Sequence, residues 1–194
     1  MSGARCVMDA ADVRRAVRRI ALELVERTRG GQGVALVGIR TRGEPLAHRI
    51  AAELREVEAL EVPVGALDIA MYRDDVFESG SRVAVGQTHL PFDVNDRHIV
   101  LVDDVLFTGR TVRAALDALM DWGRPCRIQL AVLVDRGHRE LPIQPDYVGM
   151  TLSTRVDESV RVRLAETDAG ESDRDTVHLV STPERVAAAE RRRT

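Results

Sequence analysis

The stretch Ile99–Thr111, IVLVDDVLFTGRT, decides the fold. Its first residues form an apolar run that is typical of a buried strand in a parallel sheet. Two carboxylates, Asp103 and Asp104, follow the run, and a Thr-Gly turn at 108–109 then begins a helix. Helix N-termini offer unpaired N–H groups and the positive end of the helix dipole, and open α/β sheets bind ligands at the carboxyl ends of their strands.

We therefore predict a sugar-phosphate site, with the phosphate on the turn and the sugar hydroxyls on the carboxylates. The plainer alternative is that the two acids only end a strand and that Thr108 only caps a helix. The paired acids, placed four residues before Thr-Gly-x-Thr, favour the site.

Composition narrows the function classes. The chain has 194 residues and a net charge of −3, which excludes nucleic-acid binding through bulk charge. No stretch approaches the roughly 18 apolar residues that span a membrane, so we expect no membrane partner. No apolar signal region follows the N-terminus, and Cys6 and Cys126 are too few for a disulfide framework, so we expect a cytoplasmic protein with free thiols. All 28 basic residues are arginine, which suits bidentate phosphate contacts.

Strand and helix patterns alternate along the chain. This order predicts an α/β fold with a central, mostly parallel sheet flanked by helices. We expect helices at 10–29, with Asp9 as N-cap, at 44–60 and at 109–122, and strands at 34–39, 62–71, 98–102, 127–134, 146–150 and 160–165.

The chain divides into one domain and a tail. Residues 1–165 are predicted to form the domain, and the charged segment 166–194 is predicted to be a mostly disordered tail. The segment 72–95 shows no regular period and is long for a loop, which indicates a functional flap. The loops at 39–43, from 72 onward, at 103–111 and at 135–138 all open on one edge of the predicted sheet.

A resemblance to a known family makes the predicted fold and function more specific. Residues 100–111 resemble the phosphoribosyl-pyrophosphate (PRPP) motif of type I phosphoribosyltransferases, and the segments 37–43, 68–75 and 123–143 resemble the bacterial pyrimidine-operon regulatory proteins. That family is homologous to uracil phosphoribosyltransferases and binds pyrimidine-operon mRNA. The resemblance runs from about residue 9 to 165 and implies the type I phosphoribosyltransferase fold, with a flexible flap or hood.

The resemblance also implies roles for individual residues. Asp103 and Asp104 would be catalytic, contacting the ribose hydroxyls and stabilising positive charge on the ribose as pyrophosphate leaves. Mg²⁺ would be bound mainly through the substrate, with Asp103 and Asp104 as its protein ligands, and no organic cofactor is expected. The residues implied to bind PRPP or the nucleotide are Thr41, Arg42, Gly43, Asp103, Asp104, Val105, Leu106, Phe107, Thr108, Gly109, Arg110, Thr111 and Arg136. Arg42 and Arg136 have the alternative of being ordinary loop arginines.

The flap would contain Tyr72, Arg73, Asp74 and Arg82. Family members often carry a lysine where this chain has Val85-Gly86, so Arg73 or Arg82 would substitute for it and the transferase activity could be weak.

Phe107 indicates which kind of base the site would accept. Purine transferases of this superfamily typically have an aspartate just before the Thr-Gly, acting as general acid or base on the purine ring. Phe107 stands at that position, and a phenyl ring transfers no proton. Because the N1–H of uracil is comparatively acidic, the residue favours uracil over hypoxanthine or guanine.

The resemblance further implies RNA binding on a basic dimer surface. Arg14, Arg15, Arg18 and Arg19 lie opposite the apolar stripe of the first predicted helix, and His138 and Arg139 would add to the surface. The alternative is a solvated polar helix face.

The leading hypothesis is thus a uridine-nucleotide-dependent regulator of pyrimidine-operon mRNA that retains uracil phosphoribosyltransferase activity. Its ligands would be uracil, PRPP and UMP or UTP. Its partners would be the mRNA leader and further copies of the same chain, in a dimer or a larger homo-oligomer. A purely metabolic uracil phosphoribosyltransferase and a non-catalytic nucleotide-binding regulator remain the alternatives.

Overall fold

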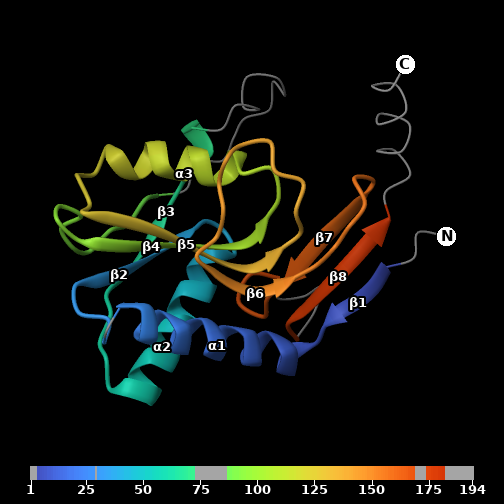
Figure 1. Ribbon diagram of the computed structural model, residues 1–194, viewed down its shortest axis with the longest axis horizontal. Helices are drawn as coiled ribbons and strands as arrows, with labels where there is room; N and C mark the ends of the chain where they lie inside the picture. The colour runs from blue at the N-terminus through green and yellow to red at the C-terminus, as the bar shows by residue number, and fades with distance from the viewer. Residues whose placement is uncertain (1–3, 29, 73–86, 169–173, 182–194) are drawn as a thin grey trace.

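The computed structural model describes residues 4–28, 30–72, 87–168 and 174–181 (Figure 1). Its centre is a five-stranded, all-parallel sheet with the order β3-β2-β4-β5-β6. The strands are β2 (Val34–Ile39), β3 (Val64–Leu67), β4 (His98–Leu106), β5 (Arg127–Asp135) and β6 (Tyr147–Thr151). The predicted parallel sheet is confirmed, and its strands are fully or largely buried, as sheets covered on both faces require.

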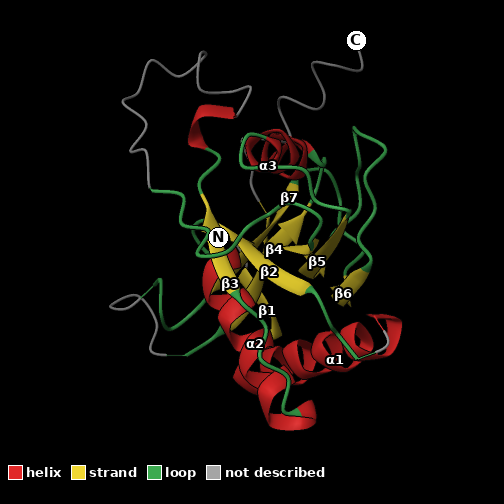
Figure 2. Ribbon diagram, turned by 90° about the vertical axis from the view of Figure 1, so that its left-hand side faces the viewer, coloured by secondary structure: helices red, strands yellow, loops and turns green. Residues whose placement is uncertain are grey.

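Helices cover both faces of the parallel sheet. Figure 1 shows α3 (Arg110–Met120) on one side and α1 (Ala10–Thr28) with α2 (Gly43–Glu58) on the other, and Figure 2 shows the same three layers from the side. Each face has its own apolar cluster, because alternate strand residues point to opposite sides. A short 3-10 helix, η1 (Ala70–Tyr72), follows β3.

The start of α1 confirms Asp9 as its cap. The Asp9 side chain accepts the N–H of Asp12 at 2.8 Å, and the Asp12 side chain accepts the N–H of Asp9 at 3.0 Å. This reciprocal pair satisfies two backbone donors that the first turn of a helix leaves without partners.

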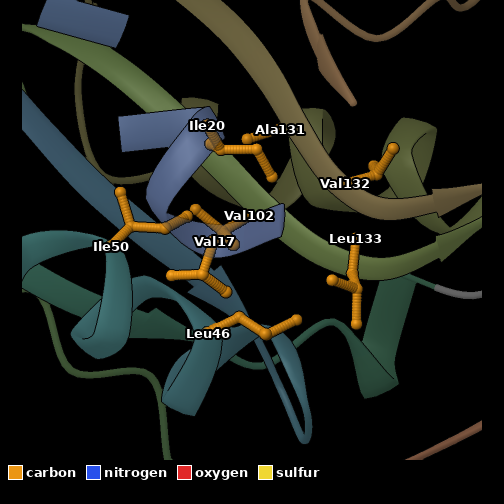
Figure 3. Close-up of a pocket in the computed structure, with 8 residues that line it drawn as sticks. All are labelled: Val17, Ile20, Leu46, Ile50, Val102, Ala131, Val132 and Leu133. Atoms are coloured by element: carbon orange, nitrogen blue, oxygen red, sulfur yellow. The ribbon is translucent and has the colours of Figure 1, made fainter. Parts of the chain in front are cut away.

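The space between α1, α2 and the sheet is core and not a ligand pocket. Figure 3 shows the side chains that enclose it, and all of them are apolar. The enclosed space does not admit a water molecule. Its lining residues are Val17, Ile20, Leu46, Ile50, Val102, Ala131, Val132 and Leu133.

A second sheet departs from the prediction. It is antiparallel, has the order β1-β8-β7, and consists of β1 (Ala4–Met8), β8 (Thr176–Ser181) and β7 (Glu158–Arg163). The expected disorder of 166–194 is wrong for β8, whose Val177 and Leu179 are buried. The strand is stabilised by pairing with β1, more than 160 residues away in the chain, and local composition does not report such pairing.

Among the described residues, no helix is long and apolar enough to cross a membrane.

Candidate active site

The two predicted catalytic residues, Asp103 and Asp104, lie on β4, which extends beyond the neighbouring strand β2. β2 pairs with β4 only as far as Gly38 opposite Val102, whereas β4 continues beside β5 to Leu106. Asp103 and Asp104 therefore sit inside the strand, in the part that β2 no longer covers, and not in a loop after residue 102 as the sequence predicts. The two carboxyl groups interact with each other, because a side-chain hydrogen bond with Asp103 lowers the pKa of Asp104.

Asp104 has a perturbed acidity. Burial raises its pKa above the usual range for aspartate, while the charge of Arg42 and a hydrogen bond from Val105 N–H to Oδ1, 2.8 Å long, oppose the rise. Asp103 is 6% exposed, and its Oδ1 accepts the N–H of Asp104 at 2.9 Å. The pair thus concentrates negative charge in a place of restricted solvent access.

The Thr-Gly turn starts α3 as predicted. Gly109 has a φ of 93°, a conformation that glycine adopts without strain, and no side chain caps the helix at that residue. The Thr108 carbonyl accepts the N–H groups of Glu140 at 2.9 Å and Leu141 at 3.1 Å. These bonds fix the turn against the 140–141 loop at the N-terminus of α3, the kind of position where helix N–H groups bind phosphate.

Glycines bring the loop 41–43 against β4. A Cβ on Gly43 would lie 2.2 Å from the Val102 carbonyl oxygen, and a Cβ on Gly38 would lie 2.5 Å from the Glu44 backbone nitrogen. The N-terminus of α2 therefore packs directly on β2 and β4, beside Asp103. The structure thus brings together two of the predicted site segments, 41–43 and 103–111.

Phe107 and Arg136 form a stacked pair at the end of β4 and β5. The Arg136 guanidinium lies 4.0 Å from the centroid of the Phe107 ring. Arg136 is only 4% exposed, and it donates to the carbonyls of Glu158 at 2.7 Å and Arg155 at 3.2 Å. Its side chain anchors the turn before β7 to the site. The predicted contact of Arg136 with the nucleotide stays a prediction.

We expect Arg136→Ala to lower the free energy of unfolding by about 2 kcal/mol, because the carbonyls of Arg155 and Glu158 lose a buried donor. Urea denaturation measures the loss. Arg155→Ala is the matched control, because the Arg155 side chain makes only an exposed ion pair with Asp157. A loss in both variants alike would contradict the anchoring role.

Arg139 is held by several contacts within its own loop. Its guanidinium donates to Asp135 Oδ2 at 2.6 Å, to the Ile143 carbonyl at 2.9 Å and to the Phe107 carbonyl at 3.0 Å. These contacts organise the 135–143 loop, and the role of Arg139 in RNA binding stays a prediction. His138 is exposed, and its ring contacts the Thr154 carbonyl at 2.7 Å.

The arginines of α1 lie on the surface, as predicted. Arg14, Arg15, Arg18 and Arg19 are all exposed residues. Carboxylates or carbonyls occupy several of them: Arg15 pairs with Asp12, Arg18 lies 3.7 Å from Glu53, and Arg19 donates to the Gly149 carbonyl.

Little of the predicted flap lies within the described residues. Arg73, Asp74 and Arg82 fall outside them. Tyr72 donates its hydroxyl proton to Asp121 at the C-terminal end of α3, the end away from the Thr-Gly turn, and this bond raises the Tyr72 pKa.

Sequence reasoning missed several residues that shape the site. Arg42 is held by Asp168, at 2.6 Å, and Arg110 by Glu140, at 2.7 Å. Glu158 supplies the carbonyl that anchors Arg136. Each partner lies 22 to 126 residues away in the chain from the arginine that it binds, so no local sequence motif indicates the contact.

Comparison with known proteins agrees with this geometry. A family model for the phosphoribosyl transferase domain matches residues 8–166. The fold resembles a hypoxanthine phosphoribosyl transferase of Trypanosoma cruzi with a TM-score of 0.68 at 17% identity, covering 96% of this chain and 95% of the other. A hypoxanthine phosphoribosyltransferase of Staphylococcus aureus gives 0.61 at 18% identity, covering 93% of each chain. At these identities the structures establish the fold alone. The fold and the matched domain thus define a type I phosphoribosyltransferase.

Curated relatives narrow the class. "Bifunctional protein PyrR" of Roseiflexus sp. (strain RS-1) is 58% identical over 180 residues, which is 93% of this chain and 97% of that protein. The protein of the same name in Thermus aquaticus is 60% identical over 162 residues, 84% of this chain and 90% of that one. The chain belongs to the PyrR family.

Proposed function

We propose that this protein regulates pyrimidine-operon mRNA, binding the mRNA leader when loaded with a uridine nucleotide, and that it also catalyses the reaction uracil + PRPP = UMP + diphosphate. Membership in a family whose relatives are named bifunctional supports both halves. One observation supports the transferase activity most directly. Three segments lie together at one edge of the sheet: the loop 41–43, the part of β4 at Asp103 and Asp104 that extends beyond β2, and the turn at the start of α3. The protein would act in the cytoplasm as a homo-oligomer.

The chemistry follows from these three parts. The N–H groups of the α3 turn bind the 5′-phosphate of PRPP, and Arg42 binds the pyrophosphate. As the bond between ribose C1′ and the pyrophosphate oxygen breaks, Asp104 and Asp103 contact the ribose hydroxyls and stabilise its positive charge. Uracil N1 then bonds to C1′ and its proton passes to the departing pyrophosphate, which yields UMP and diphosphate.

Mg²⁺ fits this site as a substrate-bound ion. The described residues contain no group of three or more His, Cys, Asp or Glu side chains placed to hold a metal, but two adjacent carboxylates are the oxygen ligands that Mg²⁺ prefers. Asp103 and Asp104 would hold the ion together with substrate oxygens, and the ion would supply positive charge against the leaving pyrophosphate.

Phe107 supports uracil as the base. The stacking of Arg136 on the Phe107 ring fixes an apolar group where purine transferases have a proton-transferring aspartate. The ring offers contact area to a base but no general acid or base.

The regulatory half is tested by RNA binding to the chain's own operon leader at fixed salt. We expect UMP to tighten binding in a gel-shift titration, and the double variant Arg15→Glu/Arg18→Glu to weaken it by about tenfold or more while reducing its salt dependence. UMP binding itself should not change in that variant.

Arg113→Glu is the matched control, because Arg113 is an exposed arginine on α3, on the opposite face of the sheet. If UMP leaves RNA affinity unchanged, the sensing role fails and a purely metabolic enzyme is favoured. If labelled uracil is not turned over while RNA binding responds to UMP, the non-catalytic regulator is favoured.

A further inference from the structure

A carboxylate that lies 126 residues later in the chain, that of Asp168, binds the Arg42 guanidinium. Arg42 Nη2 donates to Asp168 Oδ1 at 2.6 Å, and Arg42 Nε donates to Asp168 Oδ2 at 3.2 Å. Two parallel N–H···O bonds between a guanidinium and a carboxylate fix the plane of the guanidinium as well as its position.

Asp168 is itself held rigidly. Its Oδ2 accepts the Leu164 N–H at 3.0 Å and the Thr167 hydroxyl at 2.7 Å, and its own N–H donates to the Leu164 carbonyl at 2.9 Å. We call residues 164–168 the anchoring turn. The hydrogen bonds from Arg42 hold the pKa of Asp168 far below its usual range, so the carboxylate is ionised at neutral pH.

The anchoring turn is also tied to α2, the helix that begins at Gly43. Arg49 of α2 donates to Glu166 Oε2 at 2.6 Å and to Asp175 Oδ2 at 2.6 Å. Asp175 in turn accepts the Ala165 N–H at 3.1 Å. The turn therefore keeps its place relative to the helix N-terminus through contacts that do not involve Arg42.

Arg42 also interacts electrostatically with the catalytic carboxylate Asp104. Its charge lowers the pKa of Asp104 against the effect of burial, which places the guanidinium within electrostatic reach of that side chain. Arg42 thus interacts with one acid that the mechanism uses, Asp104, and with one that it does not, Asp168.

We propose that Asp168 is a positioning residue for PRPP, which orients the Arg42 guanidinium toward the pyrophosphate before substrate arrives. This inference rests on the proposed function. Its physical basis is preorganisation: an arginine already fixed in its plane loses less side-chain entropy when it binds an anion. The effect is confined to ligands that carry a pyrophosphate, because UMP has no group for Arg42 to bind.

Binding calorimetry of the full chain, with PRPP and UMP titrated separately, tests the proposal. We expect Asp168→Asn to weaken PRPP binding, and to raise the KM for PRPP, by about tenfold, since one charge-assisted contact is lost. UMP affinity should change by less than about twofold. Asp168→Glu keeps the charge and should restore part of the PRPP affinity.

Two controls separate positioning from damage to the fold. Glu166→Gln alters the same turn but leaves the Arg42–Asp168 contact, and Arg49 keeps its bond to Asp175, so PRPP affinity should be unchanged. In an Arg42→Ala background, adding Asp168→Asn should have no further effect on PRPP affinity, because its partner is already gone.

Three results would overturn the proposal. Tighter PRPP binding in Asp168→Asn would mean that Asp168 competes with substrate for Arg42. An equal loss of UMP affinity, or a full effect in the Arg42→Ala background, would mean that Asp168 acts through the fold. A wild-type protein that binds neither PRPP nor UMP would instead refute the proposed function.

Discussion

Asp104→Asn lowers the kcat of UMP formation by about 10³-fold, with a smaller change in the KM for PRPP. The carboxylate charge matters most when the ribose becomes positive, and a preorganised charge in a site of restricted solvent access contributes more to the transition state than to the bound substrate. Asparagine has the same shape but no charge. The measurement is conversion of labelled uracil to UMP at saturating PRPP.

The control is Asp117→Asn, an exposed carboxylate on α3 that pairs with Arg113 at 3.2 Å and should keep wild-type activity. Activity above about a tenth of wild type in Asp104→Asn would remove Asp104 from the reaction, because loss of one such charge costs far more than tenfold.

The pH profile gives a second reading of the same carboxylate. Because burial raises the Asp104 pKa, kcat/KM should fall on the acid side at a higher pH than an ordinary aspartate would give. Arg42 opposes that rise, so Arg42→Ala should move the acid limb to still higher pH. An acid limb that stays in place would mean that a different group titrates.

The parallel sheet and the Thr-Gly turn at the start of α3 were predictable because their signals are local. The apolar run before Asp103 and the Thr-Gly turn each lie within a few residues, and period and turn chemistry report such features directly. The length of β4 was not predictable, because its extension to Leu106 depends on β5 continuing beside it after β2 has ended.

The second sheet was missed for the same physical reason, and it matters for the site. β1 and β8 are short strands that pair across nearly the whole chain. The elements around this sheet supply both Asp168, which holds Arg42, and the Glu158 carbonyl, which holds Arg136. Two site arginines thus owe their orientation to a part of the fold that no sequence motif marks.

Gly43→Ala is expected to destabilise the protein by about 3 kcal/mol, at the upper end of what overpacking a core typically costs. The added Cβ would lie 2.2 Å from the Val102 carbonyl oxygen and 3.4 Å from Asp103 Cα. Both are backbone atoms of a buried central strand, so neither moves without breaking pairing in the sheet. The N-terminus of α2 must then retreat from β4 and carry Arg42 with it. Urea denaturation measures the stability, and PRPP calorimetry on the folded fraction measures the displacement.

Gly65→Ala is the matched control for Gly43→Ala. Gly65 also lies in the parallel sheet. Its Cβ would come within 2.6 Å of Leu90 Cδ2, the end of a flexible side chain, and its nearest backbone neighbour would be the His89 carbonyl oxygen at 3.0 Å. β3 is an edge strand, and Leu90 is only partly buried, so its side chain yields more easily than the strand backbone beside Gly43 and the loss should be smaller. Equal losses in the two variants would show that the close approach of α2 to β4 has no special role. A folded Gly43→Ala protein with wild-type PRPP affinity would show that Arg42 keeps its place without that approach.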